Sequence, residues 1–389
     1  MSDARQPAYF TAAECSVGDL AERCEVTTPP GTYPFATEVV REVVLYDSDR
    51  LRAAIAAGEG RSVMAEIAAV LRNGPGVLVF RGGVEPDAVD RATDAFRRLI
   101  AEQHAAGTSA GDHFAAPGSN DRVWNALEKL AVSDPAAFVD YYASDMIALG
   151  SQAWLGPAYQ ITSQVNQVNP GGTAQSAHRD YHLGFMSDAQ AEGFPLHTHL
   201  LSAVMTLQGA VAHCDMPVAS GPTKLLPHSQ KYPAGYVAWR RADFIEYFEE
   251  HQVQLPLTKG DVVFFNPALF HAAGTNLTTD ILRMANLLQV SSAMGRAMES
   301  VDRTRMASAI YPELLARAEA GWSSEQIDTV IAACAEGYAF PTNLDRDPPI
   351  YGLAPATEAD TLRTAVAERW SPAQLAEALA AHAERRRTS

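Results

Sequence analysis

The chain has few cysteines and no long apolar run. Its four cysteines, Cys15, Cys24, Cys214 and Cys334, have neither the paired spacing of a metal motif nor that of a disulfide framework. No apolar stretch approaches the length of a membrane span, and the amino terminus lacks the charged and then apolar pattern of a signal peptide. We therefore expect a cytoplasmic protein with no membrane partner.

Basic residues are also scarce. Lysine and arginine total 30 against 46 aspartates and glutamates, which leaves a formal net charge of -16. Such a charge repels nucleic acids and anionic lipids, so we expect neither as a partner. With 389 residues, of which 47% are hydrophobic, the chain can bury a large core. Composition leaves the oligomeric state open.

A histidine followed two residues later by an acidic residue is a candidate pair of metal ligands. The chain has three such pairs: His178 and Asp180, His213 and Asp215, and His382 and Glu384. Residues i and i+2 share a face on a strand but point in different directions on a helix. His382 follows a capping box with a proline at the first helical position, so we expect a helix there. Asp215 lies in a connection rich in proline and glycine, where the two side chains need not converge.

The remaining pair, His178 and Asp180, follows a turn signal at residues 169–172. An extended chain would place Ser176, His178, Asp180 and His182 on one face, a polar row that needs water or a metal beside it. We therefore predict that His178 and Asp180 bind a metal; the alternative is a set of ordinary polar residues at a strand end. A histidine such as His182 is more often an ordinary core or surface residue than one that contacts substrate or supports the metal ligands.

Two further residues extend this candidate site. The apolar run 262–265 is typical of a buried strand, and His271 follows it. Two histidines and one carboxylate are the ligand set that holds iron(II) on one face and leaves the opposite face open. The run 281–288 is apolar on both faces, so we expect Arg283 to be buried with it. A buried guanidinium is costly unless an anion pairs with it. That anion is either an acidic side chain, in a structural ion pair, or a ligand carboxylate held by the planar fork.

The order of these motifs carries a family resemblance. From about residue 74 to residue 292, the H-x-D pair, the connection 221–231, Lys259-Gly260-Asp261, His271 and Arg283 resemble the phytanoyl-CoA dioxygenase (PhyH) family of iron(II)/2-oxoglutarate oxygenases. The resemblance implies that His178, Asp180 and His271 are the catalytic iron(II) ligands. It also implies that Arg283 holds the far carboxylate of 2-oxoglutarate, and that O2 is the other cosubstrate.

The implied activity is oxidation of an unactivated C–H bond, by default hydroxylation, with release of succinate and CO2. Halogenating relatives have a small residue at the carboxylate position, so Asp180 argues against halogenation. Residues 226–230 depart from the usual family string, and the residues after Met294 have no counterpart that we can match. These departures leave the substrate open among amino acids, secondary metabolites and acyl thioesters.

The fold that we expect is a mainly β core with α-helices, built as a double-stranded β-helix (a jelly-roll or cupin-like barrel). The expected divisions are an N-terminal mixed segment at 1–73, the oxygenase domain with a helical insert at 74–295, and a C-terminal helical extension at 296–389. Periodicity predicts helices at 63–71 and 86–105 and strands at 76–81 and 159–167. We also expect a strand at 200–207 and a lid at 107–111.

The strand at 159–167 alternates and places Gln164 and Asn166 on a polar face. This face is either the solvent side of an edge strand or the lining of a wet pocket. In a pocket, Gln164 and Asn166 would hydrogen-bond substrate or 2-oxoglutarate. Two other classes of protein remain open: a sensor or binding module on the same barrel, and a zinc hydrolase that uses the triad around an activated water.

Overall fold

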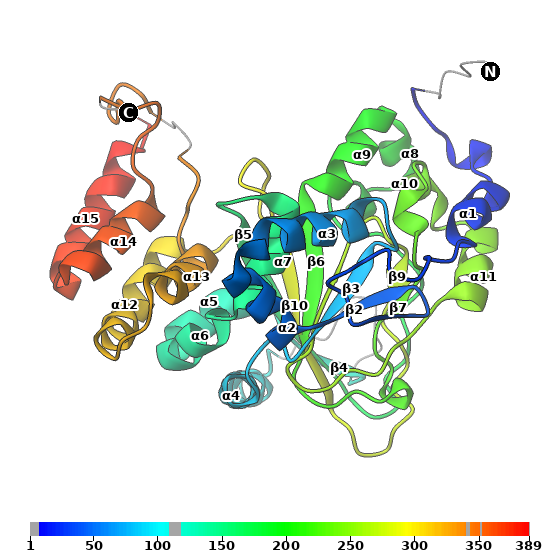
Figure 1. The fold of residues 1–389 in the computed structure, drawn as a ribbon, viewed down its shortest axis with the longest axis horizontal. Helices are drawn as coiled ribbons and strands as arrows, with labels where there is room; N and C mark the ends of the chain where they lie inside the picture. The colour runs from blue at the N-terminus through cyan, green and yellow to red at the C-terminus, as the bar shows by residue number, and fades with distance from the viewer. Residues whose placement is uncertain (1–7, 109–117, 340–342, 351, 389) are drawn as a thin grey trace.

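A computed structural model describes residues 8–108, 118–339, 343–350 and 352–388 (Figure 1). Its centre is an eight-stranded mixed sheet, and a smaller two-stranded sheet lies apart from it. Helices are more extensive than the expected mainly β core allows, because they fill most of the chain before Gln160 and after Ser291. The described strands form two sheets and no closed barrel.

The large sheet has the strand order β1-β2-β3-β8-β6-β10-β5-β4. Its strands are β1 (Glu38–Val40), β2 (Val43–Asp47), β3 (Val77–Arg81), β4 (Asn120–Val123), β5 (Gln160–Val168), β6 (Thr206–Ala212), β8 (Val262–Phe265) and β10 (Arg283–Ser291). Only β2 and β3 pair in parallel; every other neighbouring pair is antiparallel. The central strand β10 therefore has β6 on one side and β5 on the other.

The small sheet pairs β7 (Lys224–Leu225) with β9 (His271–Ala272). His178 extends it through an isolated bridge, in which the His178 amide donates to the His271 carbonyl at 3.0 Å and the reverse bond measures 3.2 Å. Apolar residues fill part of the space between the two sheets, among them Val79, Leu225 and Phe265. The small sheet thus carries both predicted histidine ligands against the inner face of the large sheet.

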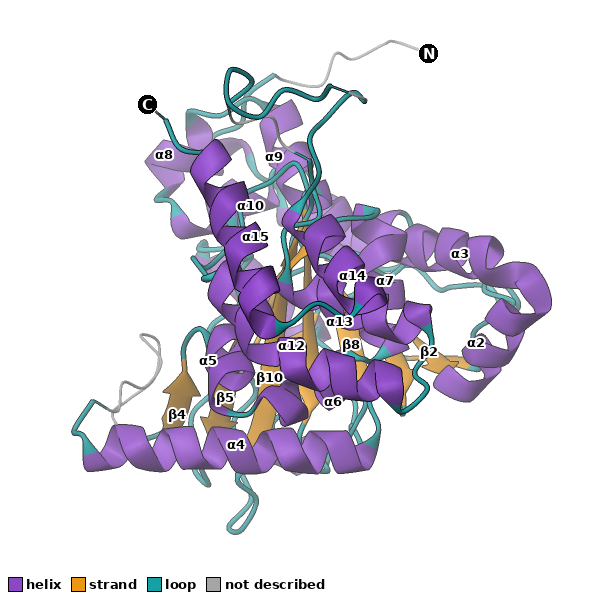
Figure 2. Cartoon of the chain, turned by 90° about the vertical axis from the view of Figure 1, so that its left-hand side faces the viewer, coloured by secondary structure: helices purple, strands orange, loops and turns teal. Residues whose placement is uncertain are grey.

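Helices cover the outer face of the large sheet (Figure 2). The longer helices of the protein are α1 (Val17–Cys24), α2 (Ser48–Ala54), α3 (Gly60–Arg72), α4 (Pro86–Ala105), α5 (Ala126–Ser133), α6 (Pro135–Tyr142), α7 (Asp145–Leu155), α9 (Leu196–Val204), α11 (Ala242–His251), α12 (Arg303–Glu319), α13 (Ser324–Cys334), α14 (Glu358–Glu368) and α15 (Pro372–Arg385). Of these, α1 and α11 do not belong to the outer face; they pack in a separate apolar cluster with Leu226 and Phe270, beside the small sheet. The short helices α8 (Asp188–Glu192) and α10 (Gly235–Ala238) lie near α9 in Figure 1.

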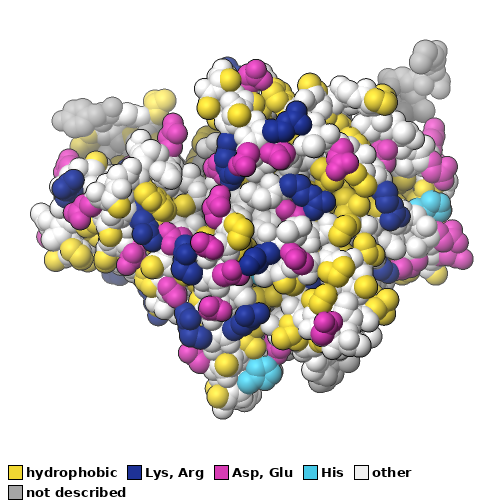
Figure 3. All heavy atoms as spheres, turned by 60° about the horizontal axis from the view of Figure 1, so that its bottom comes forward, with side chains coloured by type: hydrophobic (Ala, Val, Ile, Leu, Met, Phe, Trp, Pro, Cys, Tyr) yellow, Lys and Arg dark blue, Asp and Glu magenta, His cyan; other side chains and the backbone are white. Residues whose placement is uncertain are grey.

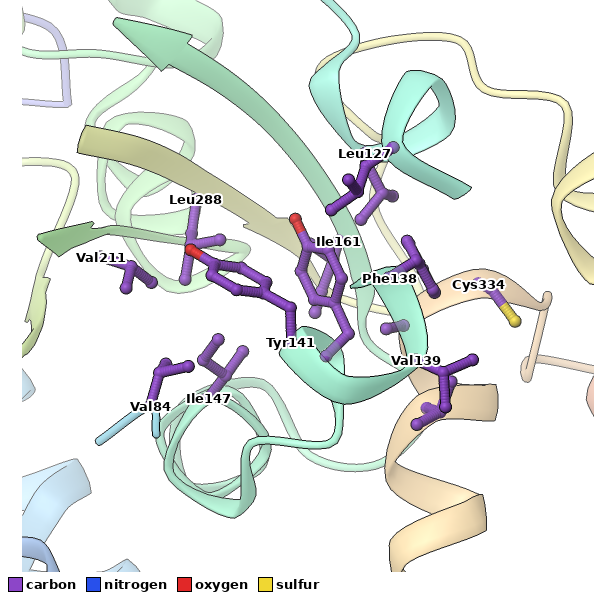
Figure 4. Close-up of a cluster of buried hydrophobic side chains, with 14 of the residues drawn as sticks. Val84, Leu127, Phe138, Val139, Tyr141, Ile147, Ile161, Val211, Leu288 and Cys334 are labelled. Atoms are coloured by element: carbon purple, nitrogen blue, oxygen red, sulfur yellow. The ribbon is translucent and has the colours of Figure 1, made fainter. Parts of the chain in front are cut away.

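One apolar core joins the outer face of the sheet to these helices. Figure 4 shows Tyr141 and Phe138 of α6 beside Ile161 of β5, with Leu288 of β10 on the other side. Cys334 of α13 belongs to the same buried cluster, as do Ile310 of α12, Leu362 of α14 and Leu375 of α15. The C-terminal helices therefore pack on the large sheet through α5 and α6 and share its core.

Several sequence predictions match the observed elements. Helix α4 has the predicted bounds, and α3, β3 and β5 lie within a few residues of theirs. The strand predicted at 200–207 is wrong: α9 occupies Leu196–Val204 and β6 begins only at Thr206. The helix buries Leu196, His199 and Ser202, a spacing of three that suits a helix and not a strand. Residues 109–111 of the expected lid lie outside the described residues.

The surface carries charges of both signs. On the face drawn in Figure 3, acidic and basic side chains are interspersed, and apolar side chains lie between them.

All four cysteines are free thiols. Within the described ranges, each helix is too short or too polar to cross a membrane.

Candidate functional site

A cavity of about 460 Å³ lies between the two sheets. Its walls are the inner face of the large sheet and the small sheet with its connections. The part over β2, β3 and β8 is apolar, with Val43, Val79 and Phe265 in the wall. The part over β10, β5 and β4 carries most of the polar side chains of the wall, such as Gln164, Asn166 and Gln289, although Ala285 and Leu287 of β10 also line it. His178, Asp180 and His271 line the same cavity, so the predicted metal ligands open into it.

The three predicted ligands converge. The ligand atoms of His178, Asp180 and His271 lie within 4.8 Å of one another. Nε2 of His178 is 3.7 Å from Oδ1 of Asp180, and Nε2 of His271 is 3.4 Å from Oδ2. The imidazole rings are tilted against each other, with their centroids 4.4 Å apart. Both histidines therefore present the same ring nitrogen to one carboxylate.

Hydrogen bonds to the backbone fix both imidazoles. Nδ1 of His178 lies 2.9 Å from the Ser176 carbonyl, and Nδ1 of His271 lies 2.9 Å from the Leu269 carbonyl. A carbonyl accepts only from a protonated nitrogen, so in both rings Nδ1 carries the proton and Nε2 is the unprotonated nitrogen, the form that can bind a metal. Nε2 of His271 is buried and has no hydrogen-bond partner among the described residues. Two imidazole nitrogens and a carboxylate in this arrangement fit an iron(II) ion.

Gln208 of β6 orients the carboxylate, and sequence reasoning missed it. Its Nε2 donates to Oδ2 of Asp180 at 2.5 Å. Burial alone raises the pKa of Asp180, but His178, His271 and Gln208 outweigh it, so the pKa lies below its ordinary value. The carboxylate is therefore ionised, as a metal ligand must be. The sequence feature that could have identified Gln208 is a long polar side chain inside the otherwise apolar stretch 207–212.

Arg283 begins β10 and lines the same cavity. Its side chain is 7% exposed, and burial lowers the pKa of the guanidinium to about 10. Nη1 donates to the Gly221 carbonyl, whereas Nε is buried and has no hydrogen-bond partner in the described part of the chain. No acidic side chain of the described chain lies within ion-pair distance of Arg283. The structural ion pair is thus not observed, and the guanidinium retains capacity for an anion that enters the cavity.

Gln164 and Asn166 of β5 also line the cavity, as the pocket interpretation of their strand expects. Gln164 accepts a hydrogen bond from Arg122 of β4 and donates to Gln289 of β10 at 3.3 Å. Asn166 accepts from Asn120 at 3.0 Å. These contacts hold both amides in the polar part of the cavity, where a ligand can reach them.

Among the described residues, no histidine other than His178 and His271 lines the cavity. Tyr181 and His182 have positive φ angles, and the chain turns into a 3-10 helix at His182, so the predicted polar row ends at Asp180. His182 instead lies 3.0 Å from the Ser202 hydroxyl through Nδ1 and does not line the cavity. His213 is buried on the outer side of the sheet between Thr93 and Tyr141.

Arg179, between the two ligands of the H-x-D pair, points away from the cavity into the protein. It is 2% exposed, and its Nη2 donates to the carbonyls of Ser229 and Tyr232 at 2.7 and 2.9 Å. Gly235 allows this position, because a Cβ there would lie 1.9 Å from the Arg179 guanidinium carbon. Arg179 thereby anchors the short segment that carries both ligands.

The site and the fold together define a class. His178, Asp180 and His271 converge in a cavity between two sheets, and a buried arginine with no described acidic partner lines the same cavity. This combination is typical of an iron(II)/2-oxoglutarate oxygenase. Residues 73–285 match the phytanoyl-CoA dioxygenase (PhyH) family. This match covers more than half of the chain, so the chain belongs to that family, as its motifs predicted.

Comparison with solved structures finds related folds at low identity. EctD from S. alaskensis, with 2-oxoglutarate and 5-hydroxyectoine, is 18% identical with a TM-score of 0.46, over 60% of this chain and 77% of that one. HygX from Streptomyces hygroscopicus, with nickel, 2-oxoglutarate and hygromycin B, is 15% identical with a TM-score of 0.43, over 60% and 90%. The epimerase SnoN, with Fe3+, alpha ketoglutarate and nogalamycin RO, is 17% identical with a TM-score of 0.40, over 60% and 85%. No curated protein sequence matches the chain.

Proposed function

We propose that the protein is an iron(II)- and 2-oxoglutarate-dependent dioxygenase that hydroxylates an unactivated C–H bond of a small molecule and releases succinate and CO2. The observation that carries the proposal is the convergence of His178, Asp180 and His271 in the same cavity that Arg283 lines. A structural metal site would need no such cavity, and a hydrolytic zinc site would leave Arg283 without a role.

Each residue has a role in this proposal. His178, Asp180 and His271 would hold iron(II), and Arg283 would bind the far carboxylate of 2-oxoglutarate. Iron and 2-oxoglutarate, when bound, supply the activation of O2 that C–H oxidation requires. Gln164 and Asn166 would orient substrate or cosubstrate by hydrogen bonds. The apolar wall excludes water from the reaction, and Asp180 occupies the position that halogenation would need empty.

The sheet arrangement supports a matching proposal for the fold. The inner strands β8, β6, β10 and β5 would be the major sheet of a double-stranded β-helix, and β7, β9 and the His178 bridge its reduced minor sheet. Metal ligands on the minor sheet and at its bridge would then face a cosubstrate site at Arg283, the first residue of β10. A cavity of about 460 Å³ has the size of an ordinary small-molecule site.

Anaerobic titration with iron(II) and 2-oxoglutarate tests the proposal. The wild-type protein should develop the weak visible charge-transfer band of the chelate and then release succinate on exposure to O2. His271→Ala should lose both, because it removes one of three ligands. His197→Ala is the matched control, since His197 is exposed and lies outside the cavity lining.

A screen of succinate release against a metabolite panel would then identify the substrate. Product mass should increase by one oxygen for hydroxylation, whereas loss of two hydrogens indicates desaturation or ring closure. Retention of the band in His271→Ala would refute the ligand assignment. Turnover with zinc in the absence of O2 would refute the oxygenase and favour the hydrolase.

A further inference from the structure

The polar end of the cavity includes an acidic residue from outside the family match. Glu299 and Met298 line the cavity, and both lie in the connection between β10 and α12. The family match ends at residue 285, so membership of the family assigns no role to this connection. The chain thus adds its own carboxylate to a cavity whose other charged lining residues are Asp180, Arg122 and Arg283.

Only one oxygen of this carboxylate is engaged. Oε1 of Glu299 accepts from the Asn125 amide at 2.9 Å and from Nε2 of Gln164 at 3.5 Å. Oε2 is shielded from solvent and has no hydrogen-bond partner among the described residues. No described basic side chain lies within ion-pair distance of Glu299. Burial raises the pKa of the carboxyl, and the hydrogen bonds from Asn125 and Gln164 and the more distant charges of Arg122 and Lys129 offset this effect only in part.

A row of amide side chains connects Glu299 to the metal ligands. Gln208 bonds Asp180, and Gln208 and Gln289 are register partners on β6 and β10. Gln289 accepts from Gln164 on β5, which in turn bonds Glu299. The row crosses two strand spacings, about 10 Å. A small molecule that reaches Glu299 can therefore still present a carbon to the metal side of the cavity.

We propose that Glu299 is a specificity-determining residue that binds an ammonium group of the substrate, so that the substrate is a small primary amine with an apolar body. This inference rests on the proposed oxygenase function and names its substrate class. An ammonium group supplies both a hydrogen-bond donor for Oε2 and a positive charge at ion-pair distance, whereas a hydroxyl supplies only the donor. The net charge of -16 favours the approach of a cation as well.

Binding of matched probes to the full-length protein tests this proposal. The probes are n-hexylammonium, 1-hexanol and hexanoate, and zinc with 2-oxoglutarate replaces the oxygen-reactive centre. We expect n-hexylammonium to bind at least tenfold more tightly than 1-hexanol, and hexanoate to bind more weakly than either. Equal or weaker binding of the ammonium probe would overturn the proposal without need of any variant.

The variant Glu299→Gln retains the size and the Oε1 acceptor but removes the charge. It should lower the affinity for n-hexylammonium at least tenfold and leave that for 1-hexanol unchanged; a smaller loss would overturn the proposal. Glu319→Gln is the matched control, because Glu319 is exposed on α12. Glu299→Asp keeps the charge and should keep the preference for ammonium.

The same probes on the metal-free chain separate this inference from the proposed function. A wild-type protein that prefers ammonium but forms no charge-transfer band with iron(II) and 2-oxoglutarate would refute the oxygenase and retain the Glu299 site. A protein that forms the band but lacks the preference would refute only the role of Glu299.

Discussion

Removal of the Arg283 guanidinium should weaken binding of 2-oxoglutarate far more than binding of iron. The side chain is 7% exposed and has no acidic partner in the described chain, so a cosubstrate carboxylate would meet it with little screening. Truncating one partner of a buried, hydrogen-bonded charge pair costs about 2–5 kcal/mol. For Arg283→Ala we therefore expect Kd for 2-oxoglutarate to rise about thirtyfold or more.

The assay is anaerobic titration of the charge-transfer band, with iron(II) varied at saturating 2-oxoglutarate and then the reverse. Arg283→Lys should lie between wild type and Arg283→Ala, because lysine keeps the charge but loses the planar fork. Arg97→Ala, on the exposed face of α4, should match wild type. A similar loss of affinity for iron and for 2-oxoglutarate in Arg283→Ala would refute the clamp and indicate a structural role.

Three further predictions concern the support of the site and of the fold. Gln208→Leu should lower iron(II) affinity by about 10- to 100-fold in the same titration, because it removes the donor to Asp180; unchanged affinity would contradict this role. Gly235→Ala should lower Tm, since overpacking against Arg179 costs about 1–3 kcal/mol, and an unchanged Tm would contradict the close approach. Burial lowers the pKa of His213 to about 3, below its ordinary value, so folding stability should be complete above about pH 6.5 and fall by up to about 1.4 kcal/mol per unit as the pH drops towards 3. Urea unfolding at several pH values measures this slope, and His213→Gln should reduce it.

Local patterns predicted the parts of this protein that depend on local chemistry. The apolar stripe of α4 and the proline at its first position were sufficient for its bounds. The segment 200–207 misled because it is apolar in almost every position, so neither the helical nor the strand period stands out. A helix there leaves Leu200 and Leu201 about half exposed, which no rule of burial anticipates.

The convergence of His178, Asp180 and His271 was predictable because their spacing and order carry the family pattern. Gln208 and Glu299 were not, because their importance depends on which strands are neighbours. Strand β6 lies between β8 and β10, and β5 lies beyond β10, an order that no local pattern in the sequence reveals. This strand order brings Gln208 within hydrogen-bond distance of Asp180, and Gln164 within hydrogen-bond distance of Glu299.

The triad is held in place by the protein itself. Backbone carbonyls fix the tautomers of His178 and His271, and Gln208 holds Asp180. The fold therefore does not need the metal to organise its ligands, in contrast to small zinc domains, whose folding free energy comes from metal binding. Nε2 of His271 is buried and has no hydrogen-bond partner among the described residues, which costs about 1–3 kcal/mol, and a bound metal would remove this cost. A site whose ligand side chains are positioned by the protein and that opens into a cavity suits an exchangeable catalytic metal better than a structural one.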